Sequence, residues 1–260
     1  MSFTVHRDGA LEYLRADALA GAIHCFSTRF GGVSTGYLKS LNLGVHRGDT
    51  PENVEKNYEI LGAAVGFRPE NLVFTHQIHS DIVRRVGAAD RGEGLARPVP
   101  LDCDGLITDE PDVALAVFSA DCTPILLHDP VRGAVGAVHA GWRGTAQKIA
   151  QITAQKLINE FGSNPKDICV LIGPAICGKC YEVGEEVYSI FSPSPLPALS
   201  SEKGGLRLDL KKINAKQLAD IGIEKIDICP YCTCCDNEYF FSYRKENGTT
   251  LRHSAVLKLN

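Results

Sequence analysis

The chain has 260 residues, and its bulk composition excludes several classes of protein. Hydrophobic residues make up 44% and charged residues 22%, which is typical of a globular protein and argues against a disordered or fibrous one. The net charge is −4, so the chain lacks the excess of basic residues that is typical of proteins that bind nucleic acid. No apolar run reaches membrane-spanning length, and the N-terminal segment carries charges where a signal peptide has its apolar centre. We therefore expect a cytoplasmic protein, and the sequence indicates no particular protein partner.

Glycine-containing turns fill the first third of the chain, and alternating strand and helix patterns follow. A helix is predicted over 51–65, and a second over 145–161 from apolar residues at near-helical spacing that end at Gly162. Two further helices are predicted over 183–191 and 209–221, joined by a loop at 191–205. Strands are predicted at 71–79, 102–109, 113–121, 124–129, 133–141 and 168–175, near Ile226 and Phe240, and at 255–259.

These elements predict an α/β fold. Because several strands follow one another without helices between them, we expect mixed β-sheets rather than one parallel sheet. No segment has the composition of a linker between domains. The prediction is a single domain with mixed β-sheets flanked by helices, a layered α/β sandwich.

The stretch FTHQIHSDIV (74–83) places two histidines three residues apart. Its β-branched and aromatic flanks indicate a strand, where an odd separation puts side chains on opposite faces. His76 and His79 should then point in opposite directions, while Gln77 and His79 share a face. His79 is the one expected at a site, and its partners must come from elsewhere in the chain.

Three polar residues follow or end predicted buried strands: His79, Cys122 and His139. The strand ends of α/β sheets are common ligand sites, and a Gly-bounded turn after His139 leads into the helix of 145–161. One Cys and two His supply the ligands that zinc prefers, with a fourth tetrahedral position left for water. The alternative for each residue is a structural role, as a hydrogen-bonded polar side chain or a small buried thiol.

The stretches around these residues resemble one family. They are QIHSD (77–81), DCDGLITDEP (102–111), SADCTPILLHDP (119–130), AVHAGWRGT (137–145), IGPAICGKCYEVGEEV (172–187) and FFSYRKENGTTLRHS (240–254), with STRFGGVSTGYLKSLNLGVHRGDTPENVEKN (27–57) similar to its N-terminal signature. This is the YfiH-type family, long labelled laccase-domain or multicopper polyphenol oxidase proteins and later recognised as purine nucleoside phosphorylases. The likeness runs in order through essentially the whole chain, so we expect one such domain over 1–260.

The resemblance implies a metal site and an activity. The family's ligands fall on His79, Cys122 and His139, which would also be the catalytic residues, with zinc as the cofactor. The implied reaction is phosphorolysis of adenosine, inosine, guanosine and 5′-methylthioadenosine, accompanied by adenosine deamination. The partners would then be a small nucleoside and phosphate. The tail departs from the family pattern, because Lys245 and Leu251 stand where a second arginine and a T-G-R triplet are usual.

The residues that would bind substrate or phosphate are less well indicated. Arg143 follows the predicted strand end and would bind phosphate bidentately or pair with Asp121. Arg29 lies in a glycine-rich stretch, and Gln77 shares the expected face of His79. Asp104 and Asp121 would orient ligand histidines or bond only to nearby backbone.

Two other chemistries remain open beside the zinc enzyme. Copper is disfavoured for two reasons. A blue-copper centre usually has an axial methionine, and the only methionine here is Met1. A multicopper enzyme also has a trinuclear cluster, which needs more than the eight histidines present. A metal-free hydrolase would use Cys122 as nucleophile and His139 as base.

The remaining cysteines include two CxxC groups, Cys177 with Cys180, and the overlapping set of Cys229, Cys232 and Cys235. Paired CxxC motifs indicate a zinc ribbon when they lie some 15–20 residues apart. These lie much farther apart. We therefore expect reduced, partly buried thiols rather than a second, structural zinc site.

Overall fold

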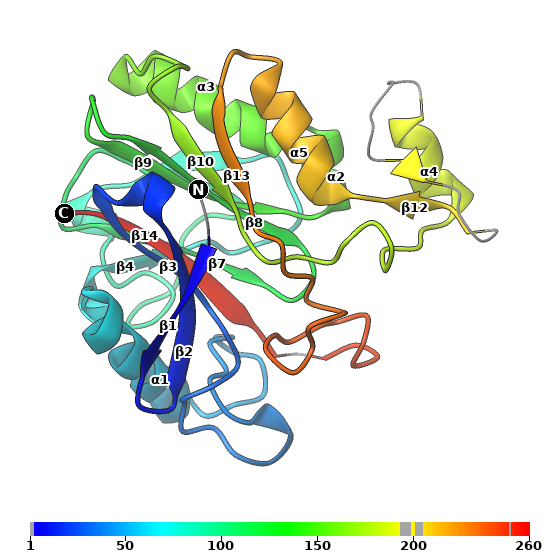
Figure 1. Cartoon of the computed structure of the whole chain (residues 1–260). Coiled ribbons are helices and arrows are strands. Elements are labelled where there is room, and N and C mark those ends of the chain that lie inside the picture. Colours follow the sequence, from blue (N-terminus) through cyan, green and yellow to red (C-terminus); the bar gives the residue numbers. More distant parts are fainter. Residues whose placement is uncertain (1–2, 193–198, 201–204, 250) are drawn as a thin grey trace.

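The computed structural model describes residues 3–192, 199–200, 205–249 and 251–260 (Figure 1). Its framework is two six-stranded mixed sheets that pack face to face, with helices on their outer faces. The predicted α/β class and the layered arrangement are confirmed.

The first sheet has the strand order β1-β2-β3-β14-β7-β4. Its central strand β14 is antiparallel to β3 and β7, with Ala255 opposite Phe26 on one side and Val117 on the other, while β4 is parallel to β7. The strand bounds are β1 Phe3–Asp8, β2 Leu11–Ala16, β3 Ala22–Ser27, β4 Leu72–Phe74, β7 Ala114–Ser119 and β14 His253–Leu259.

The second sheet has the order β13-β10-β8-β9-β6-β5. Strands β8 and β9 form its antiparallel centre, with Pro124 opposite His139, and β13 is parallel to β10. The bounds are β5 Val83–Arg85, β6 Gly105–Thr108, β8 Thr123–Asp129, β9 Ala134–Ala140, β10 Cys169–Ile172 and β13 Lys225–Ile228; a separate small pair is β11 Leu199–Ser200 with β12 Arg207–Leu208.

Strand β7 shows why a continuous apolar run is required here. Leu115 and Val117 lie in the core between the sheets, whereas Ala114 and Ala116 face the cluster around α1 (Pro51–Val65). Successive strand residues point to opposite faces, so a strand covered on both sides must be apolar throughout. Each fully buried leucine or valine contributes roughly 1.5–3 kcal/mol to folding through burial alone.

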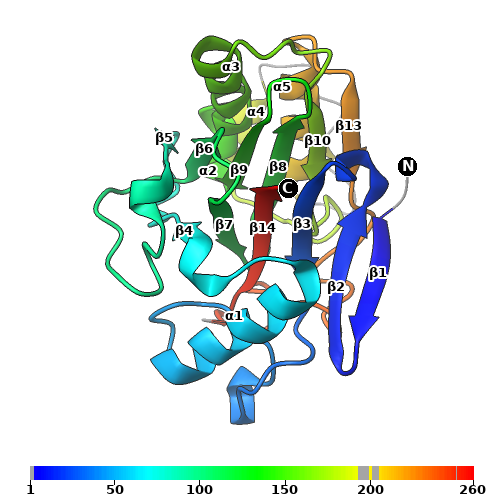
Figure 2. The same ribbon diagram turned by 90° about the vertical axis from the view of Figure 1, so that its left-hand side faces the viewer.

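Helices cover the two outer faces. Helix α1 packs on the first sheet, while α3 (Ile149–Phe161) and α5 (Leu210–Ala219) pack on the second, so they lie on opposite sides of the molecule (Figure 2). The predicted helix at 51–65 has the expected bounds, because the Thr50 side chain accepts from the backbone N–H of Asn53 and Gly66 ends the helix with φ of 107°. The remaining helices are α2 (Trp142–Ala146), α4 (Glu185–Phe191) and short 3-10 turns at Asp17–Leu19, Gly36–Leu38, Pro69–Asn71 and Ala88–Asp90.

Several sequence-based predictions of secondary structure differ from the structure. The helix predicted over 145–161 is two helices, because Lys148 takes a left-handed conformation (φ 62°) between α2 and α3. The strand predicted near Phe240 is wrong, since turns replace it around the buried ring. The strands β1, β2 and β3 were not predicted. Most of the loop predicted at 191–205 lies outside the described residues.

Within the described ranges, no helix combines the length and apolar character needed to cross a membrane.

Two buried histidines make stability depend on pH. Nε2 of His24 accepts the N–H of Ala16 at 3.0 Å, so its Nδ1–H donates to the carbonyl of Ala22, and the ring is neutral. Burial lowers the pKa of His24 to about 4 and that of His253 to about 3.

We expect the free energy of unfolding to fall as the pH drops from about 6.5 toward 4. An unfolded histidine binds its proton near pH 6.5, whereas these folded ones do so only at much lower pH, so acid favours the unfolded chain by about 1.4 kcal/mol per pH unit for each histidine. Urea unfolding at several pH values checks this. His24→Gln should be less stable at pH 7 but should show a shallower slope by about one proton; an unchanged slope would contradict the assignment.

Candidate functional site

The structure brings together the three residues singled out from the sequence. One ligand atom from each of His79, Cys122 and His139 lies within 4.8 Å of the other two. His79 follows β4, Cys122 lies in the turn between β7 and β8, and His139 is the next-to-last residue of β9. The cluster therefore draws on both sheets, at the edge where they meet.

The local structure of His79 differs from the strand predicted over 71–79. Strand β4 ends at Phe74, and His79 has a φ of 62°. The cause is Asp104, whose carboxylate accepts the backbone N–H groups of Ile78, His79 and Ser80 and the Ser80 hydroxyl, which folds the chain into a tight turn.

The side chain of His76, three residues before His79, does not join the cluster. His76 is exposed and its Nδ1 lies 2.7 Å from Oδ1 of Asp102. His76 was expected to point away from His79 because strand residues alternate between faces. It does lie outside the cluster, but the reason is the turn after β4.

Asp104 also fixes His139. Its Oδ1 lies 2.8 Å from Nδ1 of the imidazole, and its backbone carbonyl accepts the N–H of His139 at 2.8 Å. Because Nδ1 donates to Asp104, Nε2 is the nitrogen left for Cys122 or a metal. Burial lowers the pKa of His139, but the Cys122 sulfur and the Asp104 carboxylate outweigh burial and raise this pKa to about 9.

Cys122 is held by a different carboxylate. Asp121 has a φ of 91°, and its carboxylate bonds to residues outside the cluster. It accepts the hydroxyls of Thr233 and Ser242 at 2.6 and 2.7 Å and the N–H of Arg244 at 2.6 Å. Asp121 therefore fixes the turn that carries Cys122 rather than orienting a histidine.

The cluster is open on the side of His79. Partial burial and the charges of His139, Arg143 and Arg252 lower the pKa of His79, which favours the neutral imidazole that a metal requires. Gly141 packs directly against the cluster. A Cβ at Gly141 would lie 2.5 Å from Nδ1 of His79 and 3.2 Å from Sγ of Cys122, so a larger residue there would displace a cluster side chain.

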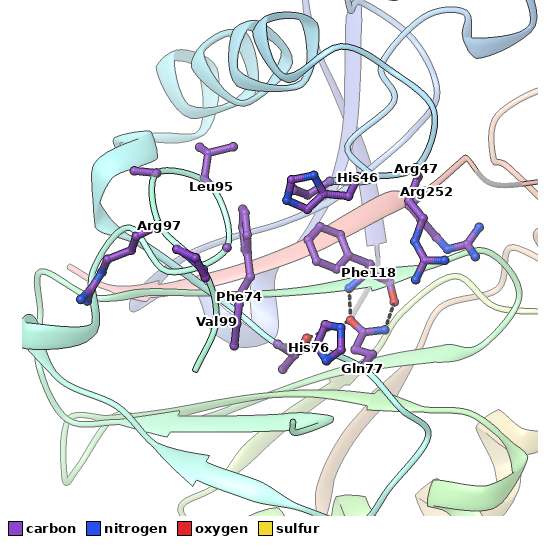
Figure 3. Close-up of a pocket in the computed structure, with 16 residues that line it drawn as sticks. His46, Arg47, Phe74, His76, Gln77, Leu95, Arg97, Val99, Phe118 and Arg252 are labelled. Carbon is purple, nitrogen blue, oxygen red and sulfur yellow. Dashed lines mark hydrogen bonds between the residues drawn. The ribbon is translucent and has the colours of Figure 1, made fainter. Parts of the chain in front are cut away.

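An arginine-rich cavity of about 500 Å³ adjoins the turn that carries His79 (Figure 3). Arg47 and Arg252 lie together on its wall, and burial together with Arg47 lowers the pKa of Arg252. The charges of Cys122 and Asp121 act in the opposite direction and raise the pKa of Arg252. Two adjacent guanidiniums suit an anion such as phosphate. Neither arginine was predicted as a site residue, although Arg47 lies in the LGVHRGD stretch and Arg252 in LRHS.

The three residues expected to bind substrate lie in different surroundings. The amide of Gln77 is engaged by strand β7, donating to the Phe118 carbonyl at 3.0 Å and accepting its N–H at 2.7 Å (Figure 3). Arg29 lines a different cavity, of about 510 Å³, where it pairs with Glu246 at 2.9 Å. Arg143 is exposed, stacks over Trp142 at 4.2 Å and is close enough to affect His79.

The donor set fits a metal ion. A thiol and two imidazoles are zinc ligands, His139 has the carboxylate partner that metal-bound histidines usually have, and the His79 side is open for a further ligand. The same residues would accept copper, and Cys122 beside His139 also has the arrangement of a nucleophile and its base.

A second group of thiols also lies together, contrary to the expectation from spacing. Atoms of Cys177, Cys180, Cys232 and Cys235 lie within 4.8 Å of one another, while Cys229 and Cys234 stay outside.

Comparison with known proteins places the chain in a family. Residues 23–260 match the family model described as multi-copper polyphenol oxidoreductase laccase. The chain belongs to the laccase-like YfiH family. It is 39% identical to "Purine nucleoside phosphorylase YlmD" of Geobacillus stearothermophilus, over 97% of this chain and 96% of that protein. It is also 39% identical to "Purine nucleoside phosphorylase" of Deinococcus radiodurans, over 96% and 93%.

Solved structures of YfiH-family proteins have the same fold. The crystal structure of YlmD from Geobacillus stearothermophilus superposes with a TM-score of 0.91 at 37% identity and full coverage of both chains. The Bacillus licheniformis hypothetical protein YfiH gives a TM-score of 0.91 at 34% identity over 99% of each chain.

In this YfiH-type chain, Asp104→Asn should weaken metal binding about 10- to 100-fold. The amide cannot accept all the hydrogen bonds that position His79 and His139, because one of its two terminal atoms is a donor. Competition with a chelator, monitored by zinc content, measures the loss. Asp102→Asn is the control, since the Asp102 carboxylate bonds to exposed His76, which lies outside the cluster, and this variant should keep wild-type affinity. Equal affinities for the two variants would contradict the role of Asp104.

Gly141→Ala should displace His79 and also weaken metal binding. The control is Gly184→Ala, because Gly184 precedes α4 with φ of −74°, the same as Gly141 before α2, and a Cβ there meets nothing within 4 Å. Backbone strain is thus matched and only the contact with the cluster differs. Zinc affinity retained in Gly141→Ala would show that the cluster tolerates a methyl group there.

Proposed function

We propose that the protein is a zinc-dependent purine nucleoside phosphorylase in which His79, Cys122 and His139 bind the metal and form the catalytic centre. The observation that carries the proposal is the Cys–His–His cluster, together with an arginine pair in the cavity next to the turn of His79, in a chain whose relatives are named purine nucleoside phosphorylases. The proposed substrates are adenosine, inosine, guanosine and 5′-methylthioadenosine, with hydrolytic deamination of adenosine as a second activity. We place the reaction in the cytoplasm and treat 1–260 as one domain of the family.

In phosphorolysis a phosphate oxygen bonds to C1′ of the ribose while the C1′–N9 bond breaks. The purine leaves with the bonding electrons and takes up a proton, giving the free base and ribose 1-phosphate. Zinc would supply a Lewis acid at the open side of the cluster, able to activate water for deamination or to polarise a substrate oxygen or nitrogen.

The protein's own residues would bind and orient the reactants. Arg47 and Arg252 would neutralise the phosphate, because two guanidiniums side by side can bond several of its oxygens at once. Arg143, exposed and close enough to affect His79, would approach the same anion from the cluster side, whereas Arg29 and Gln77 would contribute by holding neighbouring loops. The cavity of about 500 Å³ is of the size that small ligands occupy, and its Phe118 offers a partly buried ring against which a purine could lie.

The metal-free alternative uses the same contact between Cys122 and His139. In that reading the thiolate attacks the substrate and the imidazole transfers the proton, so His79 and the metal are dispensable. Copper-dependent oxidation of phenols is the other competitor, and the sequence lacks the histidine and methionine content for it.

The purified protein should release adenine from adenosine only when phosphate is present, and should form inosine from adenosine without it. Chromatography of the products, with and without phosphate, measures both. Oxygen consumption with a phenol should be negligible. Copper-dependent phenol oxidation without nucleoside turnover would show that the protein is an oxidase and not a nucleoside phosphorylase.

Single alanine variants of His79, Cys122 and His139 should lose zinc and turnover in parallel, because two remaining ligands hold the ion far more weakly and metal ligands act as a unit. Zinc per chain and the rate of adenosine phosphorolysis are measured on each variant after its fold is checked by circular dichroism. His6→Ala is the control, since His6 is an exposed residue of β1 that belongs neither to the cluster nor to the lining of the cavity. An inactive Cys122→Ala protein that keeps its zinc, beside an active His79→Ala protein, would instead establish Cys122 as a nucleophile.

A further inference from the structure

The second thiol cluster is built by two tight turns at one edge of the second sheet. Cys177 and Cys180 lie after β10, and Cys232 and Cys235 lie after β13. Since β10 and β13 are parallel neighbours, both turns leave the sheet at the same end. Each cysteine of the first pair meets one of the second across 55 positions of sequence.

Both turns have a backbone that directs the sulfurs to a common point. In the first turn, the N–H groups of Cys180 and Tyr181 both donate to the Cys177 carbonyl at 2.9 Å. In the second, the N–H of Asp236 donates to the Cys232 carbonyl, and the Cys232 N–H donates to Oδ2 of Asp236, each at 2.8 Å. The turns are therefore fixed by the protein before any ligand is considered.

The sulfur geometry suits a divalent metal. The four sulfurs lie within 4.8 Å of one another, and Sγ of Cys180 lies 3.3 Å from Sγ of Cys235. A tetrahedral zinc with four thiolates at about 2.3 Å has sulfurs about 3.8 Å apart, so the ligands need to move by only a fraction of an ångström. The N–H groups of Cys177 and Cys235 also donate to Sγ of Cys232, at 3.2 and 3.4 Å, so the backbone of both turns holds this sulfur in place.

A disulfide is the competing use of these sulfurs. It requires the two atoms at about 2.05 Å, and all ten cysteines are free in the structure. Two CxxC pairs that converge from separate turns are the arrangement of closed structural zinc sites, in which protein ligands fill all four positions.

We propose that Cys177, Cys180, Cys232 and Cys235 bind a second, structural zinc ion that fixes the turn carrying Cys122. The link is Asp121. Its backbone carbonyl accepts the N–H of Ile176, next to Cys177, at 3.0 Å, and its carboxylate accepts the hydroxyl of Thr233, next to Cys232, at 2.6 Å. The two turns that the ion would join thus both hold the residue before Cys122.

The protein, produced with zinc in the medium and purified without chelator or nickel affinity resin, should contain two zinc ions per chain by mass spectrometry of the metal. The double variant C180S/C235S should contain one and melt at a lower temperature. Cys234→Ser is the matched control, because Cys234 lies in the same turn but outside the cluster, and should keep both ions and the wild-type melting temperature. Cys122→Ala should lose the other ion and keep this one.

Cobalt substitution tests the ligand set even if the double variant does not fold. In the Cys122→Ala background, Co²⁺ should give the intense visible absorption of tetrahedral thiolate coordination. Absence of that absorption, or wild-type protein with no more zinc than C180S/C235S, would overturn the proposal. So would a count of six rather than ten free thiols in the denatured, unreduced, metal-free protein, since two disulfides would then occupy the cluster. None of these measurements depends on the reaction proposed for the first site.

Discussion

The candidate site depends on one buried carboxylate. Asp104 is fully excluded from solvent, yet it accepts hydrogen bonds from three consecutive backbone N–H groups, from the Ser80 hydroxyl and from the imidazole of His139. An isolated charge in such a place would cost several kcal/mol, and these donors offset the cost. Burial raises the pKa of Asp104, but the hydrogen bonds from His139 and Ser80 outweigh burial and lower it overall. The same bonds set the turn of His79 and the ring orientation of His139, so one side chain positions two of the three candidate ligands.

Asp121 positions the third candidate ligand, Cys122. It holds the Cys122 turn in a left-handed conformation that an aspartate seldom adopts, and it does so through donors from Thr233, Ser242 and Arg244, more than a hundred residues later in the chain. The two carboxylates therefore position different ligands. Asp104 organises the ligands from the β4 turn and β9, and Asp121 ties Cys122 to the loops that follow β10 and β13.

Much of the framework and of the site could be predicted from the sequence, because those features are determined by residues that are adjacent in the chain. The α1 bounds follow from a threonine cap and a glycine stop, and the strands β7, β8 and β9 follow from continuous apolar runs. Cys122 and His139 do lie at strand ends as predicted, whereas His79 reaches the cluster from a turn beyond β4. Features that depend on distant partners could not be read in this way. The strand expected through His79 is a turn because of Asp104, whose role emerges only when the chain has folded, and Phe240 is buried without belonging to a strand.

The thiol cluster and the arginine pair show the same limit. Spacing along the chain argued against a second zinc site, since ribbon-type sites draw their ligands from nearby turns, but a parallel β10–β13 pair brings together turns that are far apart in sequence. Likewise, Arg47 and Arg252 come from opposite ends of the chain and meet only because β14 lies in the middle of the first sheet, with Arg252 directly before it.

The two cysteine-containing sites differ in the way their chemistry requires. The cluster of His79, Cys122 and His139 has an exposed member, His79, and a cavity adjoins the turn that carries this residue, so a bound ion there would retain a position for a substrate or water. The cluster of four cysteines supplies a complete tetrahedral set from two rigid turns, so an ion there would have no free position and would act only by holding those turns together. Since both turns bond to Asp121, the closed site would support the open one, and the geometry of Cys122 would depend on a ligand set that never meets the substrate.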